Sequence, residues 1–254
     1  MRLSLLQLGV FAGADAPVPG YLVQTDDGVT ILIDTGCPRG MIGMQKQAAT
    51  QVLAAFPGDA RMAPTAWSIR GVRFDAEDLV VNRLAALGLT PRDINILICT
   101  HFDWDHAGNH DLFPDAEFVV QRRHYEVARE HPRFRLFGVP WDTPALRYRF
   151  VGGDTELLPG IELIESGGHV PGHQSVLLRL PETGPVLLAI DAIANRGQLD
   201  PQAPDSPADM DHDAQRASVR KLVAIAAREG VELIVFGHDA EQWRTLRKAP
   251  EFYA

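Results

Sequence analysis

The decisive stretch of this sequence is Ile94-Asn95-Ile96-Leu97-Ile98-Cys99-Thr100-His101-Phe102-Asp103-Trp104-Asp105-His106, in which an apolar run ends in a hexapeptide with two histidines and two aspartates. The apolar run predicts a buried strand, and the hexapeptide predicts the loop that leaves it. Imidazole nitrogens and carboxylate oxygens bind divalent zinc, iron, manganese and cobalt, and several of them on one short loop fix most of a coordination geometry. The stretch therefore favours a metal site over its alternative, a solvated acidic turn with incidental histidines.

Three further stretches place metal-binding side chains directly after apolar runs. They are Gly167-Gly168-His169-Val170-Pro171-Gly172-His173, Leu188-Ala189-Ile190-Asp191 and Val235-Phe236-Gly237-His238-Asp239. If these strand ends share one edge of two packed sheets, their side chains can converge on two metals. The candidate ligands are His101, Asp105, His106, His169, Asp191 and His238.

Other histidines and one further aspartate have structural interpretations. We expect His173 to hold its loop through a backbone hydrogen bond, and Asp34 either to support a ligand histidine or to cap a turn. Surface-like contexts remove four histidines from the candidate ligands, namely His110, His124, His131 and His212.

Length and composition limit what the protein can be. The chain has 254 residues and 46% hydrophobic content, enough for a full core, and because no linker stands out we expect one domain over residues 1–254. A net charge of −9 argues against a nucleic-acid or anionic-membrane partner, which clustered Lys and Arg would bind. The two cysteines, Cys37 and Cys99, are too few for a disulfide framework, and the first residues resemble a signal peptide only loosely. We therefore expect a cytoplasmic protein.

Hydrophobic patterns and turn residues predict the order of the elements. Alternating or continuous apolar runs predict strands over residues 2–8, 20–25, 29–34, 94–99, 117–121, 155–158, 161–166, 175–180, 186–191 and 232–236. Helical spacing predicts helices over residues 45–56, 75–88, 125–130, 214–229 and 241–247. Residues 132–150 are expected to form an aromatic loop and residues 196–209 an exposed loop. Two successive groups of strands predict two sheets.

Several blocks of the chain resemble the metallo-β-lactamase superfamily, and within it the acyl-homoserine lactonase branch. They are Pro17-Val18-Pro19-Gly20-Tyr21-Leu22-Val23, Ile33-Asp34-Thr35-Gly36, the histidine and aspartate loop with Ala107-Gly108-Asn109, Gly168-His169-Val170-Pro171-Gly172-His173-Gln174-Ser175, Phe236-Gly237-His238-Asp239-Ala240-Glu241-Gln242 and Ala249-Pro250-Glu251-Phe252-Tyr253. The resemblance implies an α/β fold of the αββα sandwich type, with two mixed sheets flanked by helices.

The resemblance also implies a metal-dependent hydrolase that opens a lactone ring or a related small ester through a hydroxide that bridges two divalent metal ions. Zinc is the preferred metal, with manganese, iron or cobalt as alternatives. The implied ligands are His101, Asp103 and His169 for the first metal, Asp105, His106 and His238 for the second, and Asp191 for both. Asp105 would also donate a proton to the leaving oxygen. The alternatives are a thioesterase, phosphodiesterase or β-lactam hydrolase on the same scaffold, or a non-catalytic ligand-binding or metal-binding relative.

Two positions depart from the pattern of this family. Asp103 stands where the family usually has a histidine, and Ala194 stands where lactonases commonly have a tyrosine. The carboxylate adds one negative charge, so we expect a less acidic bridging water and a first site more tolerant of manganese, iron or cobalt. Tyr21, Tyr148 and Tyr253 are candidates by residue type to replace the missing hydroxyl.

Aromatic residues in and near the loop over residues 101–106, which we call the metal loop, are the candidates for the substrate pocket. They are Phe102, Trp104, Trp67, Phe137 and Trp141, together with Met62 and Phe134, and the alternative is that they pack in the core. The irregular segment 40–67 could be a pocket lid or a dimer interface, and a homodimer is the preferred interpretation.

Overall fold

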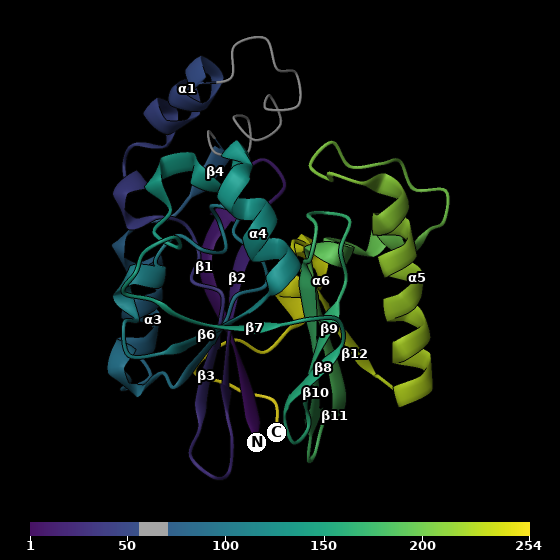
Figure 1. Cartoon of the computed structure of the whole chain (residues 1–254). Coiled ribbons are helices and arrows are strands. Elements are labelled where there is room, and N and C mark those ends of the chain that lie inside the picture. Colours follow the sequence, from purple (N-terminus) through teal and green to yellow (C-terminus); the bar gives the residue numbers. More distant parts are fainter. Residues whose placement is uncertain (56–70) are drawn as a thin grey trace.

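Figure 1 shows a computed structural model of the chain, in which residues 1–55 and 71–254 are described. Its strands are β1 (Arg2–Phe11), β2 (Ala16–Gln24), β3 (Thr30–Ile33), β4 (Val72–Arg73), β5 (Ile96–Ile98), β6 (Glu117–Gln121), β7 (Arg147–Val151), β8 (Thr155–Leu158), β9 (Ile161–Glu165), β10 (Gln174–Leu180), β11 (Gly184–Ile190) and β12 (Leu233–Phe236). The α-helices are α1 (Gln45–Ala55), α3 (Val80–Ala85), α4 (Arg122–Glu130), α5 (His212–Glu229) and α6 (Ala240–Thr245). Short 3₁₀ helices are η1 (Arg39–Met41), η3 (Ala76–Asp78), η4 (Pro91–Asp93), η5 (His110–Leu112), η6 (Pro132–Gly138), η7 (Asp191–Ile193) and η8 (Arg196–Leu199).

The described strands form two mixed sheets. The first has the order β4-β1-β2-β3-β5-β6-β7, antiparallel from β4 to β3 and parallel from β3 to β7. The second has the order β12-β11-β10-β9-β8, in which only β11 and β12 run parallel. Figure 1 shows α3 outside the first sheet and α5 outside the second. This is the αββα sandwich that the sequence predicts.

The alternation of side chains along the strands explains the four layers. The core between the sheets contains alternate residues of both, among them Leu3, Leu5, Ile31, Ile33, Ile96 and Ile98 from the first sheet and Val176, Leu178, Val186 and Leu188 from the second. The residues between them point outward. Leu32 and Leu97 belong to the same buried cluster as Leu84 of α3, and Leu177 and Leu187 belong to the same cluster as the buried apolar residues of α5.

Two expectations about elements are wrong. Residues 147–151 form strand β7 rather than part of a loop, because exposed Arg147 and Arg149 alternate with Tyr148 and Phe150 at a sheet edge and hide the apolar pattern. The helix expected from Asp75 is divided into η3 and α3, because Leu79 has an extended ψ of 135° between them.

The edge of the sandwich collects the loops that the sequence analysis singled out. The metal loop follows β5, residues 166–173 connect β9 to β10, Asp191 follows β11, and His238 follows β12. Since β5, β9, β11 and β12 all point their carboxyl ends to this edge, the four segments meet there. In the described part of the chain, no helix is long and apolar enough to cross a membrane.

Candidate metal centre

Two groups of three side chains lie side by side at this edge, and each is suited to hold one metal. The first trio is His101, Asp103 and His169, and the second trio is Asp105, His106 and His238. In the first trio, the Oδ2 atom of Asp103 lies 3.4 Å from His101 Nε2 and 3.1 Å from His169 Nε2. In the second trio, Oδ2 of Asp105 lies 3.6 Å from His106 Nε2 and 3.8 Å from His238 Nε2.

Asp191 lies between the trios and gives one carboxylate oxygen to each. Its Oδ2 atom lies 3.8 Å from His101 Nε2 and 3.4 Å from His169 Nε2. Its Oδ1 atom lies 3.5 Å from His106 Nε2 and 3.1 Å from His238 Nε2. Ligands about 2.1 Å from a tetrahedral zinc ion are separated by about 3.4 Å, so both sets of atoms have the spacing of a metal site.

Buried atoms without partners support the same interpretation. Among the described residues, His101 Nε2, His106 Nε2 and Asp191 Oδ1 are buried and have no hydrogen-bond partner. A buried polar atom without a partner is costly, whereas one metal ion at each trio would satisfy His101 Nε2 in the first and His106 Nε2 and Asp191 Oδ1 in the second. The residues present therefore fit two divalent metal ions.

The other ring nitrogen of each ligand histidine is held by a hydrogen-bond partner. The Nδ1 atoms of His106 and His169 lie 2.8 Å from Asp34 Oδ2 and 2.9 Å from Asp209 Oδ1. His101 Nδ1 lies 3.0 Å from the hydroxyl of Thr100, and His238 Nδ1 lies 2.8 Å from the carbonyl oxygen of Pro17. Such partners fix the tautomer so that every Nε2 lone pair faces the centre.

Of the two roles expected for Asp34, the structure has the support of a ligand histidine. Besides binding His106, its carboxylate accepts hydrogen bonds from the backbone N–H and the hydroxyl of Thr100, at 3.0 and 2.7 Å. Asp34 therefore connects the end of β3 to the metal loop after β5. Asp209 has the same role toward His169, so the expected exposed loop 196–209 is wrong at its end, where Asp209 is buried against the centre.

Asp103 points into the first trio and is paired with Arg133, which the sequence analysis did not identify. Arg133 Nε donates to Asp103 Oδ1 at 2.7 Å, Nη2 donates to Asp103 Oδ2, and Nη1 donates to the carbonyl oxygen of Ala208 at 2.6 Å. Burial disfavours the Asp103 carboxylate, but the guanidinium holds the pKa of Asp103 well below its usual value. The extra negative charge expected from Asp103 is thus offset by Arg133, which corrects the charge count of the centre.

Opposite charges lie close together in the centre and shift its pKa values. Burial disfavours the charged form of His106, yet Asp191 and Asp105 raise the pKa of this histidine well above its usual value. Burial likewise favours neutral Asp191, but His238 and His106 hold its pKa well below that of an ordinary aspartate. A metal must displace the protons that these groups share, so metal binding is expected to depend on pH.

A cavity of about 310 Å³, which we call the site cavity, opens above both trios. Its lining includes Asp103, Asp105, His169, Asp191 and His238 together with Arg133. The apolar part of its wall includes Phe11, Trp104 and Ala194. A small molecule in this cavity would therefore meet the metal-binding atoms and an apolar wall at the same time.

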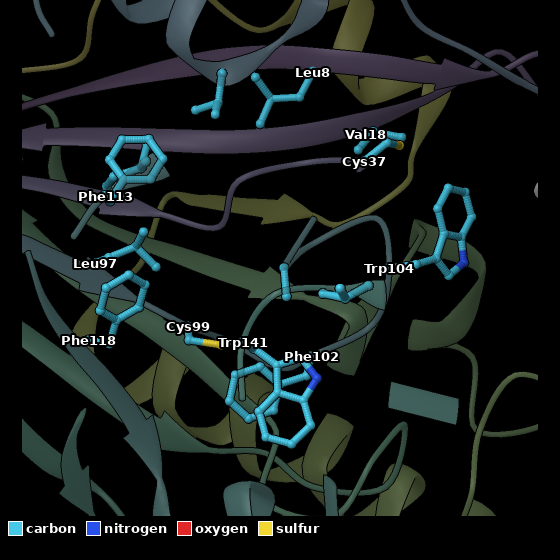
Figure 2. Close-up of a cluster of buried hydrophobic side chains, with 14 of the residues drawn as sticks. Leu8, Val18, Cys37, Leu97, Cys99, Phe102, Trp104, Phe113, Phe118 and Trp141 are labelled. Atoms are coloured by element: carbon cyan, nitrogen blue, oxygen red, sulfur yellow. The ribbon is translucent and has the colours of Figure 1, made fainter. Parts of the chain in front are cut away.

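The expected pocket residues fall into different places. Trp104 lines the site cavity, and the ring of Phe137 lies edge-on to it, with centroids 6.1 Å apart. Phe102 and Trp141 do not line this cavity: they are buried in the core, where their rings stack 4.4 Å apart (Figure 2). The expected lining role of Phe102 and Trp141 is wrong because the loop turns Phe102 inward and Trp104 outward. Trp67 and Met62 lie outside the described residues.

None of the three candidate tyrosines lines the site cavity. Tyr21 is fully buried between the sheets, and its hydroxyl has no hydrogen-bond partner among the described residues. Tyr148 donates its hydroxyl to the carbonyl oxygen of Trp141, and Tyr253 accepts from the backbone N–H of Arg247. The hydroxyl expected at position 194 has no tyrosine substitute in this structure.

Two histidines expected at the surface are buried. His124 accepts the backbone N–H of Phe102 at 2.8 Å, and its Nδ1 lies 2.9 Å from the carbonyl oxygen of Pro171, so it connects the two loops that carry His101 and His169. His110 is completely buried against the ring of Phe118. The surface expectation failed because the residues that cover these rings are distant in sequence.

His173 belongs to neither trio. Its ring bonds the Ser166 hydroxyl at 2.9 Å, and its carbonyl oxygen accepts the backbone N–H of Ser166 at 2.8 Å. The expected loop-holding role is therefore present, with a side-chain contact in addition to the backbone one.

The sandwich and the two trios at its edge define a metallo-hydrolase of the αββα class. A sequence profile of the metallo-beta-lactamase superfamily matches residues 14–238, and the chain belongs to this superfamily. It is similar to an N-acyl homoserine lactonase from a Bacillus species, at 32% identity over 94% of this chain and 87% of the relative. It is also similar to the N-acyl homoserine lactonase AttM of Azorhizobium caulinodans, at 33% identity over 95% of this chain and 89% of the relative.

Solved structures confirm the fold and the resemblance to this branch. A crystal structure of an AiiA mutant from B. thuringiensis, with N-decanoyl-L-homoserine bound at the active site, matches with a TM-score of 0.82 at 28% identity. A structure of an N-acyl homoserine lactone hydrolase with the product N-hexanoyl-L-homoserine at the catalytic metal centre matches equally well, with a TM-score of 0.82 at 28% identity. Each match covers 99% of this chain and 98% of the other chain.

Proposed function

We propose that this protein is a metal-dependent hydrolase that opens the lactone ring of N-acyl homoserine lactones. One observation carries the proposal: two trios with Asp191 between them lie beneath a cavity with an apolar wall, and side chains of both trios line it. The relatives described above support it, since they are N-acyl homoserine lactonases, and two similar structures hold an N-acyl homoserine at the active site or metal centre.

In this proposal His101, Asp103 and His169 hold one divalent metal, Asp105, His106 and His238 hold the second, and Asp191 binds both. Metals bound in this way supply an acidified water molecule and a polarised substrate carbonyl. We propose zinc, because imidazole and carboxylate ligands in a four-coordinate arrangement suit it. Manganese, iron and cobalt are the alternatives.

The remaining tasks fall to side chains that line the site cavity. Asp105 places a carboxylate oxygen at the second trio and at the cavity, where it can hand a proton to the ring oxygen as the ring opens. Phe11 and Trp104 lie with their rings 6.0 Å apart and offer an apolar surface for an acyl chain. The ring of Phe137 packs edge-on against Trp104.

A substrate panel tests the proposal. The purified protein is incubated with short-chain and long-chain N-acyl homoserine lactones, simple γ- and δ-lactones, aryl esters, thioesters, phosphodiesters and β-lactams, each with and without a chelator. We expect chelator-sensitive ring opening of the N-acyl homoserine lactones at the highest kcat/KM. A preference for thioesters, phosphodiesters or β-lactams would indicate another hydrolase on this scaffold, and metal binding without any turnover would indicate a non-catalytic relative.

The single domain over residues 1–254, the cytoplasmic location and the homodimer stay predictions of the sequence. Light scattering of the purified protein measures its molar mass in solution and so tests the homodimer. A molar mass equal to that of one chain would contradict the homodimer.

A further inference from the structure

We propose that Arg133 binds the carbonyl oxygen of the substrate and stabilises the negative charge that develops there. This inference rests on the proposed hydrolase function and assigns a role in it to a residue outside both trios. Three properties of the guanidinium group suit it to this role: its fixed position, its unused N–H groups and its access to the site cavity.

The guanidinium is held in one position. Its Nε and Nη2 atoms donate hydrogen bonds to the two carboxylate oxygens of Asp103, and Nη1 donates to the carbonyl oxygen of Ala208. A bidentate pair of this kind fixes direction as well as distance. Because Asp103 itself lies 3.1 Å from His169 Nε2, the pair fixes the charge of Arg133 beside the first trio.

The guanidinium also has N–H groups to spare. An arginine carries five N–H groups, and the bonds to Asp103 and Ala208 use three of them. Nη2 lies 3.0 Å from His169 Nε2, the only further acceptor near it that the described residues provide. Since Asp209 accepts a hydrogen bond from the N–H at Nδ1, the Nε2 lone pair of His169 is available to a metal ion in the trio. With the lone pair so engaged, an N–H of Nη2 is left without an acceptor beside the first trio.

Arg133 can be reached by a bound molecule. Its side chain is 16% exposed and lines the site cavity together with Asp103 and His169 of the first trio and Asp105 and His238 of the second. In the described part of the lining, it is the only lysine or arginine. Ala194, on the same wall, has no side-chain donor.

The reaction needs a donor at this place. The oxygen of a water molecule bonds to the carbonyl carbon, the bond from this carbon to the ring oxygen breaks, one proton passes to the ring oxygen, and a second proton is released to leave a carboxylate. Negative charge builds on the carbonyl oxygen during this step and stays on the carboxylate product. A fixed, partly buried N–H group stabilises this negative charge more strongly than a group that must reorient. Loss of one such donor typically lowers kcat by about 100-fold or more.

Three variants test whether Arg133 binds the substrate or only balances the charge of Asp103. They are Arg133→Met, Arg133→Lys and the double variant Asp103→His/Arg133→Met. Arg135→Met is the matched control, because Arg135 lies on the same η6 but is 52% exposed and pairs with Asp142. Three quantities are measured for each protein: metal ions per chain by mass spectrometry, kcat and KM, and the affinity for N-hexanoyl-homoserine by calorimetry.

We expect Arg133→Met to keep the metal content of the wild type, to lose about 100-fold in kcat, and to bind the ring-opened product at least tenfold more weakly. Arg133→Lys should be intermediate, and Arg135→Met unchanged. The double variant has a histidine in the first trio and no unpaired carboxylate, so its charge is balanced. It should still have a low kcat, because it lacks the N–H donor of Arg133. Recovery of wild-type kcat in the double variant, or loss of metal in Arg133→Met that accounts for its lost activity, would overturn the inference.

The proposed function can fail separately. If the wild type opens no lactone, the kinetic comparison is made with the ester that it does hydrolyse. If it hydrolyses none, weaker product binding by Arg133→Met than by the wild type still supports the Arg133 site, and equal binding rejects it.

Discussion

Asp34 and His106 are 72 residues apart in sequence, yet Asp34 Oδ2 lies 2.8 Å from His106 Nδ1. The contact is fully buried and connects the end of β3 to a ligand of the second trio. The carboxylate keeps the proton on Nδ1 and turns Nε2 toward Asp191 and the rest of the second trio.

We expect Asp34→Asn to weaken metal binding at the second trio by about 10- to 100-fold, because a carboxylate that orients a ligand histidine typically contributes this much. Competition with a chromophoric chelator measures the affinity. Asp115→Asn, at an exposed position away from the centre, is the control. An unchanged affinity in a folded Asp34→Asn protein would show that Thr100 and the loop alone position His106.

Asp191→Asn should lower the occupancy of both metal positions, whereas Asp103→Asn should lower only that of the first. The physical reason is that the two oxygens of Asp191 face different trios, while Asp103 contacts only the first. Metal analysis after dialysis distinguishes the two variants. Equal loss of metal in both would contradict the shared role of Asp191.

Removal of the metals should lower the melting temperature by roughly 5–10 °C. A ligand present at about 100 times its Kd stabilises the native state by about 2.7 kcal/mol, which corresponds to this shift in a chain of this size. Scanning calorimetry before and after treatment with a chelator measures the change, and readdition of zinc should reverse it. A melting temperature independent of metal would mean that the trios bind no ion tightly.

His110 should make the fold sensitive to acid. Burial lowers the pKa of His110 to about 3, against about 6.5 in an unfolded chain. A histidine with a lowered pKa takes up its proton on unfolding, so its contribution to stability is complete above pH 6.5 and is lost as the pH falls toward 3.

Replacing His110 by Leu should therefore remove about 2 kcal/mol of the difference in the free energy of unfolding between pH 7 and pH 5. Urea unfolding at both pH values measures this difference for the two proteins. The comparison between them isolates His110 from the other buried histidines. The same pH dependence in His110→Leu would contradict the prediction.

The candidate metal ligands could be located in the sequence because the four segments that carry them each follow an apolar run. His101, Asp191 and His238 follow buried strands in sequence as well as in space, so a local pattern is enough to find them. Strand β7 was missed for the opposite reason, since it lies at a sheet edge and its exposed arginines break the local apolar pattern.

Arg133 could not be found in the same way. It lies 30 residues from Asp103, in a segment without a strand or a repeated pattern, and its role exists only through that contact. The same applies to Phe102 and Trp104, which are two residues apart in the loop although one packs on Trp141 and the other lines the site cavity.

The sequence by itself determined two groups of strands and the candidate metal ligands that follow them, because apolar patterns and strand-end residues are encoded by neighbours in the chain. The αββα sandwich followed from the resemblance of several blocks of the chain to the metallo-β-lactamase superfamily. Only the tertiary structure decided that Asp34 supports His106, that Arg133 neutralises Asp103, and which aromatic ring faces the site cavity. These outcomes depend on hydrogen bonds and packing between segments that strand pairing brings together from distant parts of the chain, and no local pattern records them.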